Sequence, residues 1–161
     1  MIKKINLLFL TLFSIGKIKY APGTLASFVT CLFFIIFINS LGMYSMLIIT
    51  LLIFFYSFVA INNSFDQFDN DDPQEIVIDE VVGQMLVLLA IPIYETLYPL
   101  PQIYYCLGAF LLFRIFDILK PYPINYVDNY VKGSLGIMLD DIIAGFYAIA
   151  VMIILFFFLG G

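Results

Sequence analysis

The chain has 161 residues, of which 63% are hydrophobic and only 12% charged, and its mean hydropathy is +1.07. Soluble domains use fewer apolar and about twice as many charged residues. This composition excludes a soluble enzyme with a short anchor and predicts a single domain over residues 1–161 embedded in a lipid bilayer. The net charge of −5 and the lack of a basic stripe argue against a nucleic-acid partner.

Several kinds of chemistry are excluded by residues and motifs that the chain lacks. Without histidine there is no phosphohistidine chemistry, no Ser-His triad and no histidine-bound zinc. Neither GxxxxGK[ST] nor GxGxxG is present, so we expect no nucleotide to bind through those loops. Cys31 and Cys106 lie in apolar runs and are expected to be buried hydrophobic residues. Catalysis would therefore depend on carboxylates, Arg, Lys, hydroxyl groups and a bound ion.

The N-terminal segment 1–16 resembles a signal peptide, with two lysines, a short apolar run and a small residue at its end. Its apolar part, 5–15, is too short to cross about 30 Å of hydrocarbon. We interpret it as an uncleaved interfacial or re-entrant helix. The next stretch, KYAPGTLAS, predicts a turn into a helix with Thr24 as N-cap.

Five longer apolar segments follow, and they predict an all-α, polytopic helical bundle with about five spanning helices. The predicted spans are 24–38, 43–61, 81–98, 102–119 and 136–159. The short connections at 39–42 and 99–101 are typical of antiparallel neighbours. The connections at 62–78 and 120–135 are longer and polar.

The charges of the connections predict the orientation. Alternating spans put 1–23, 62–79 and 118–135 on one side of the membrane, and every lysine of the chain falls on that side. Positively charged connections mark the cytoplasmic face. We therefore expect these segments to face the cytoplasm.

Two pairs of acidic residues open predicted spans on this same side. Asp79 and Glu80 lie in IVIDEVVG, and Asp140 and Asp141 lie in GIMLDDIIAG. One such pair is equally well explained by favourable interaction with the helix dipole. Each pair is closely followed by a glycine, which would let a neighbouring helix approach.

A third charged group closes the fourth span. Arg114, Asp117 and Lys120 in FRIFDILKPYPI are spaced by three residues and so share one side of a helix. A structural ion pair with a lysine at the lipid surface would explain this group alone. Two acidic pairs and this group at one membrane surface instead favour a functional site.

Carboxylates that converge repel one another, so their ionised form needs a cation. Oxygen ligands without His or Cys favour a hard ion, and Mg²⁺ commonly binds a few carboxylates together with phosphate oxygens. The APGT turn, with Gly23 and Thr24, adds backbone N–H groups that can receive a phosphate. The acidic residues of the loop 66–75 are interpreted as a solvated run and left out of the site.

The blocks APGTLAS, DPQEIVIDEVVGQ, FRIFDILKPYPI and GIMLDDIIAG, in this order, resemble those of the phosphatidylglycerophosphatase A family. Ala26 and Ser134 are small-for-small departures from glycines common in that family. The resemblance implies a Mg²⁺-dependent lipid phosphatase of the bacterial inner membrane. Its phospholipid substrate would be phosphatidylglycerophosphate and its products phosphatidylglycerol and phosphate.

The resemblance also carries the motif residues over to Asp79, Glu80, Arg114, Asp117, Lys120, Asp140 and Asp141. Asp79, Asp140 and Asp141 would hold Mg²⁺, with Glu80 as a further ligand or as a base that orients water. Arg114 would bind the phosphate as a fork and Lys120 as a point charge. For Asp117 the sequence leaves metal binding, orientation of Arg114 and attack on phosphorus open.

Three other kinds of protein agree less well with the sequence. An ion- or proton-coupled transporter also needs buried acids, but here they crowd one face, and Glu95 is the ionisable residue left in the outer half. A CDP-alcohol phosphotransferase would carry a DxxDGxxAR…GxxxDxxxD pattern, which is absent. A purely structural membrane subunit would not explain the clustered charges.

Overall fold

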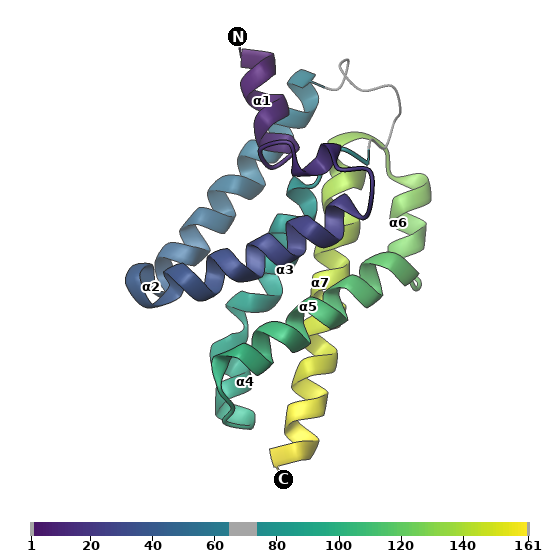
Figure 1. Ribbon diagram of the computed structural model, residues 1–161. Coiled ribbons are helices and arrows are strands. Elements are labelled where there is room, and N and C mark those ends of the chain that lie inside the picture. Colours follow the sequence, from purple (N-terminus) through teal and green to yellow (C-terminus); the bar gives the residue numbers. More distant parts are fainter. Residues whose placement is uncertain (1, 65–73, 161) are drawn as a thin grey trace.

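The computed structural model describes residues 2–64 and 74–160, and within these ranges the protein is helical with no strands (Figure 1). The chain begins with the short helix α1 and the 3₁₀ turn η1, and six further helices follow. Their bounds are α1 Ile2–Leu10, η1 Ile15–Lys17, α2 Pro22–Ser64, α3 Ile78–Leu89, α4 Ile91–Leu97, α5 Gln102–Leu119, α6 Ile124–Tyr130 and α7 Gly133–Gly160. The predicted all-α class is confirmed.

Four helical segments of the described chain are long and apolar enough to cross a membrane: Pro22–Ser64, Ile78–Leu97, Gln102–Leu119 and Gly133–Gly160. The first of these is α2, which turns a corner at Gly42 and so has two arms, visible in Figure 1. Each arm corresponds to one predicted span, and the continuous pair α3–α4 corresponds to another. The prediction of a polytopic membrane bundle is confirmed.

Two local predictions about α2 are wrong. The break expected over 39–42 is confined to Gly42, whose φ of 77° and ψ of 164° are readily adopted by glycine alone. Helical geometry otherwise continues up to and beyond this corner. Thr24 is not the N-cap, because the helix already begins at Pro22 and Leu25 N–H donates to the carbonyl of Ala21. Proline suits this first helical position because the position needs no N–H donor.

The N-terminal helix α1 is too short to be among the candidate spans, in agreement with the sequence. It packs on the second arm of α2, where Tyr56 donates a hydrogen bond of 2.9 Å to Asn6 and stacks edge-on against Phe9. The backbone of 12–14 then adopts positive φ and leads through η1 to the start of α2.

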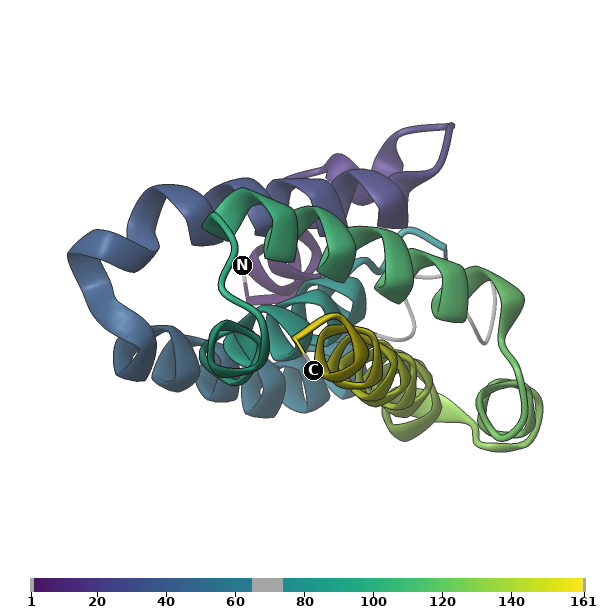
Figure 2. The same ribbon diagram turned by 90° about the horizontal axis from the view of Figure 1, so that it is seen from below.

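Helix α3 lies at the centre of the bundle and packs against α2, α5 and α7 (Figures 1 and 2). Glycines permit its close crossing with α7. A Cβ atom at Gly83 would lie 2.8 Å from the carbonyl oxygen of Asp141, and one at Gly145 would lie 3.1 Å from that of Gly83. The prediction that small residues after each acidic pair allow close helix approach is confirmed. This crossing sets the distance between the two acidic pairs.

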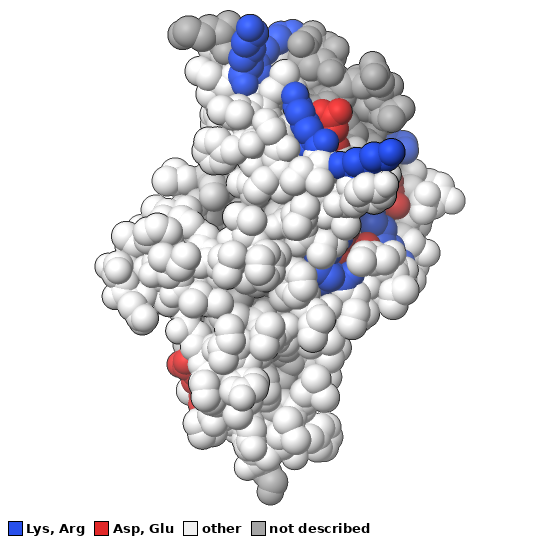
Figure 3. Space-filling view, in the orientation of Figure 1, with Lys and Arg blue, Asp and Glu red and all other residues white. Residues whose placement is uncertain are grey.

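The outer surfaces of the helices are apolar, as a lipid environment requires. Large side chains such as Ile48, Leu52, Leu111 and Phe157 are exposed along α2, α5 and α7. Basic side chains gather in the upper part of the face shown in Figure 3, and the lower third of that face shows none. The polar end of the bundle is therefore the end where α3 and α7 begin and α5 ends.

Candidate active site

A cavity of about 470 Å³ opens at this polar end, between the starts of α2 and α3, the end of α5 and the second and third turns of α7. Every residue that the sequence proposed for the site lines it. Its lining consists of Lys19, Ala21, Pro22, Gly23, Thr24, Gln74, Ile76, Asp79, Glu80, Arg114, Asp117, Ile118, Lys120, Ile137, Asp140 and Asp141. The volume falls in the usual range of small-molecule sites.

Three carboxylates meet on the inner wall of the cavity. Asp79 and Glu80 come from the first turn of α3 and Asp141 from α7, and one oxygen atom of each lies within 4.8 Å of the others. Asp141 is only 3% exposed. The glycine crossing of α3 and α7 explains this proximity, because it brings the Asp141 backbone against Gly83.

Two oxygens of these carboxylates, Asp79 Oδ1 and Glu80 Oε2, are buried without a hydrogen-bond partner among the described residues, and so is Oδ1 of Asp140, which also lines the cavity. Buried charged oxygens that lack a partner are costly, and like charges nearby add to the cost. A bound cation would satisfy both demands. Asp79, Glu80 and Asp141, which we call the acidic group, can therefore hold a metal ion.

Arg114 stands opposite the acidic group on α5. It forms an ion pair with Asp117 one turn later, and its Nη1 atom lies 3.8 Å from Glu80 Oε1. Gly23 packs against both side chains: a Cβ atom there would overlap the Glu80 carboxylate and lie 3.2 Å from Arg114 Nη1. The start of α2 thus approaches the site as closely as its backbone allows.

Lys120 ends α5 in a left-handed conformation, with φ of 42°. Its amine forms an ion pair with Asp128 of α6 and donates a hydrogen bond of 2.8 Å to Oδ2 of Asp140. Burial opposes the charge of this amine, but the hydrogen bonds and charges of the two carboxylates raise the pKa of Lys120 above its ordinary value. The amine therefore stays protonated at neutral pH.

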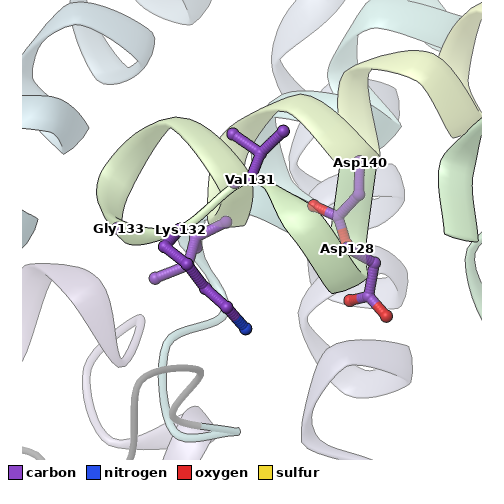
Figure 4. A pocket seen from close by; sticks show the side chains of 7 residues that line it. Asp128, Val131, Lys132, Gly133 and Asp140 are labelled. Carbon is purple, nitrogen blue, oxygen red and sulfur yellow. The ribbon is translucent and has the colours of Figure 1, made fainter. Parts of the chain in front are cut away.

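A small cavity of about 20 Å³ lies beside this ion pair, where α6 meets the start of α7. Figure 4 shows Asp128 and Asp140 next to each other at its wall. Asp140 therefore pairs with Lys120 in this structure. It is not one of the three carboxylates whose oxygen atoms lie within 4.8 Å of one another. The sequence placed all four acids together without this division.

The loop acids fall outside the candidate site or outside the described residues. Asp66, Asp69, Asp71 and Asp72 lie outside the described residues. Glu75 is described and exposed, and it is not among the residues that line the cavity.

Sequence reasoning missed three polar residues near the site. Lys19 and Gln74 line the cavity, and Asp128 binds Lys120. Lys19 is the first residue of the block KYAPGTLAS, three residues before Pro22. Its closeness in sequence to Gly23 could therefore have predicted a position near the site. Asp128 had no such signal, because its position depends on how α6 folds back after the two prolines.

Fold and site together define a helical membrane protein with a carboxylate-rich polar cavity, lined by Arg and Lys, at one end of its bundle. Residues 8–156 match the sequence profile of the family Phosphatidylglycerophosphatase A. A Phosphatidylglycerophosphatase A of Haemophilus influenzae is 38% identical over 140 residues, which cover 87% of this chain and 82% of the relative. The chain belongs to the phosphatidylglycerophosphatase A family, and it is a membrane lipid phosphatase.

Two further relatives are also named as lipid phosphatases. A Bacteroides thetaiotaomicron protein named "Putative phosphatidylinositol-3-phosphatase" is 34% identical over 139 residues, 84% of each chain. The Phosphatidylglycerophosphatase A of Escherichia coli is 39% identical over 74 residues, 46% of this chain and 39% of the relative. No solved structure matches the chain.

Proposed function

We propose that this protein hydrolyses the phosphomonoester of phosphatidylglycerophosphate, releasing phosphatidylglycerol and phosphate, with Mg²⁺ as cofactor. The observation that carries the proposal is the cavity in which the Asp79–Glu80–Asp141 group faces Arg114. Family membership and the name of the Haemophilus influenzae relative support the substrate. A phosphorylated headgroup lies just outside the hydrocarbon, at the level where polar helix ends are expected.

The donor set fits magnesium. Asp79, Glu80 and Asp141 offer only carboxylate oxygens, and at least two of these oxygens are buried without a partner among the described residues. Hard cations prefer such ligands. When bound, Mg²⁺ would neutralise charge on the phosphoryl group and position it.

The cations of the cavity bind the phosphoryl oxygens in this proposal. Arg114 presents a planar fork of N–H donors, and Asp117 holds that fork in place through its ion pair. Lys120 adds a point charge near Asp140. The N–H groups of Gly23 and Thr24 lie in the first turn of α2, where no acceptor within the helix exists, so they can also receive an anion.

Water is the nucleophile that we assign, because Asp117 is engaged by Arg114. Where Asp79 and Asp141 hold the metal, Glu80 beside Arg114 can act as the base instead of as a further ligand. Its oxygen without a described hydrogen-bond partner can then take a proton from the attacking water. A bond forms between the water oxygen and phosphorus, and the bond from phosphorus to the glycerol oxygen breaks. The glycerol oxygen then takes up the proton that Glu80 accepted from the water and leaves as the alcohol of phosphatidylglycerol.

We further propose that the cavity faces the cytoplasm across the bacterial inner membrane. The lysines of the connections, which lie with the cavity at the polar end of the bundle, support this orientation through the positive-inside rule.

The direct test uses the purified protein in detergent with phosphatidylglycerophosphate and Mg²⁺. We expect stoichiometric release of phosphate and phosphatidylglycerol, identified by mass spectrometry. Intact substrate after prolonged incubation, with a correctly folded sample, would contradict the proposed reaction.

A further inference from the structure

The three cations that line the cavity differ in their partners. Arg114 is paired with Asp117, and Lys120 is held between Asp128 and Asp140. Lys19 is exposed and forms no ion pair with a carboxylate of the described residues. Its amine lies 5.8 Å from the centre of the Tyr20 ring. Lys19 is thus the lining cation whose charge is not offset by a described acid.

Lys19 also occupies a particular part of the cavity. It precedes α2, whose first arm runs beside α5 in both ribbon views, and Phe28 contacts Phe110 across this pair (Figures 1 and 2). Ile118, near the end of α5, lines the same cavity and is 66% exposed. The rim between the start of α2 and the end of α5 is therefore where the cavity meets the apolar outer surface. Acyl chains of a bound lipid would leave the cavity at this rim.

The substrate of the proposed function carries two phosphate groups. The terminal phosphomonoester is the reacting group, and a phosphodiester joins the glycerol to the diacylglycerol. With the monoester at Arg114 and the acidic group, the diester must lie between them and the acyl chains, which is toward the rim. A buried or half-buried diester anion needs a cation there.

We propose that Lys19 binds this phosphodiester and so forms a second anion subsite, an inference that rests on the proposed function. A lysine suits the task, because its flexible stem crosses the apolar rim while the charged head reaches a phosphate. The subsite favours lipids that carry a diester between the acyl chains and the monoester. Phosphatidic acid, whose monoester is attached directly to diacylglycerol, gains nothing from it.

The two reaction products test the two subsites separately. Phosphatidylglycerol keeps the diester and lacks the monoester, whereas inorganic phosphate reports on the monoester site alone. For Lys19→Ala we expect the concentration of phosphatidylglycerol that half-inhibits the enzyme to rise about fivefold, as for one partly exposed charge contact. Inhibition by phosphate should stay unchanged. The KM for phosphatidylglycerophosphate should rise by a similar factor with kcat unchanged, because the contact is the same in ground and transition states.

Lys17→Ala is the matched control, since Lys17 is exposed and only two residues earlier but does not line the cavity. In micelles of uncharged detergent, Lys17→Ala should leave inhibition by phosphatidylglycerol, inhibition by phosphate, KM and kcat unchanged. An equal effect of both variants would mean general attraction to an anionic surface and would overturn the proposal. Unchanged inhibition of Lys19→Ala by phosphatidylglycerol would overturn the proposal as well. So would an equal weakening of inhibition by phosphatidylglycerol and by phosphate in that variant.

Binding measured without turnover separates this inference from the proposed reaction. Native mass spectrometry of the purified protein with phosphatidylglycerol should show weaker occupancy in Lys19→Ala than in wild type and Lys17→Ala. A wild-type protein that fails to hydrolyse phosphatidylglycerophosphate would contradict the proposed function alone. Equal occupancy in all three proteins would contradict the subsite, whatever the activity.

Discussion

Arg114 and Lys120 illustrate how the same charge has different consequences in two surroundings. Arg114 faces the acidic group from the opposite wall, with Glu80 at 3.8 Å and Asp117 holding its guanidinium. Lys120 is drawn toward Asp128 and Asp140 at the edge of the cavity. The planar fork of Arg114 can make two parallel bonds to a phosphoryl group, and an ammonium cannot replace both.

Replacing each cation by the other tests this difference. Arg114→Lys keeps the charge but loses the fork, so we expect kcat to fall at least about tenfold, equivalent to about 1.4 kcal/mol. Lys120→Arg keeps a cation between two carboxylates and should cost less. Steady-state kinetics of both variants on a short-chain lipid substrate would decide. Equal, small losses would show that Arg114 is merely a counter-ion.

Asp140 and Asp128 form a second matched pair, because both bind the Lys120 amine. Asp140 also lines the large cavity and has a buried oxygen without a described partner, whereas Asp128 is absent from that lining. Asp140→Asn should therefore lower kcat at least about tenfold, and Asp128→Asn should have an effect several times smaller. Both variants should retain the thermal stability of a folded bundle to a similar degree. Equal kinetic losses would place Asp140 in a structural role only.

At this scale the sequence was sufficient to select residues but not their partners. The proposed site residues could be chosen because ionisable side chains are rare and costly in an apolar chain. Which acid meets which cation depends on side-chain direction and on the turn after Pro121. The Lys120–Asp128 pair spans that turn, and no spacing rule for a continuous helix applies across it.

Among the elements, the crossing of α3 and α7 is what brings the acidic pairs together. Its geometry is set at Gly83, where an added Cβ atom would lie 2.6 Å from the Phe113 ring and 2.8 Å from the Asp141 carbonyl oxygen. At Gly108 in α5 the nearest atom, Cε of Met152, would be 3.4 Å away. The two glycines therefore differ in packing although both are helical.

Gly83→Ala should destabilise the protein by about 1–3 kcal/mol through overpacking, partly offset by about 1 kcal/mol of helix propensity. It should also weaken activation by Mg²⁺, because Asp141 would be displaced. Gly108→Ala gains the propensity without the clash and should keep or raise the melting temperature. Thermal unfolding of both variants in detergent tests the comparison. Equal melting temperatures would mean that the close crossing is not required.

The elements themselves were largely predictable, since long apolar runs leave few alternatives to spanning helices. Their ends were less predictable. The chain turns between two arms through one residue, Gly42, because its positive φ supplies the whole corner. The start of α2 was misplaced at Thr24, since the proline two residues earlier already fits the first helical turn.

Over the whole molecule, basic side chains and the polar cavity gather at one end of the bundle. The cavity, the lysines and the starts of α3 and α7 share one end, and α4 and the C-terminal end of α7 lie at the other (Figures 1 and 3). The bundle is thus polar at one end and apolar along its sides, as expected for an enzyme that meets its substrate at a membrane surface.

Cysteine labelling tests the proposed orientation. Asn129→Cys on α6 should react with a membrane-impermeant reagent from the cytoplasmic side, and Thr96→Cys on α4 from the outside. Both positions are exposed, while the native Cys31 and Cys106 are buried and give little background. The reverse pattern would place the cavity on the outer surface and contradict the orientation.

Phosphate release from phosphatidylglycerophosphate, measured after exhaustive chelation and again after adding Mg²⁺, tests the central claim most directly. Wild-type protein should lose activity with chelation and regain it with Mg²⁺ but not with zinc, because the converging ligands are all hard oxygens. Asp79→Asn and Asp141→Asn should insert and fold yet stay inactive under both conditions. Full activity of the chelated wild type, or near-wild-type rates in either variant, would contradict a metal-dependent site built on these carboxylates.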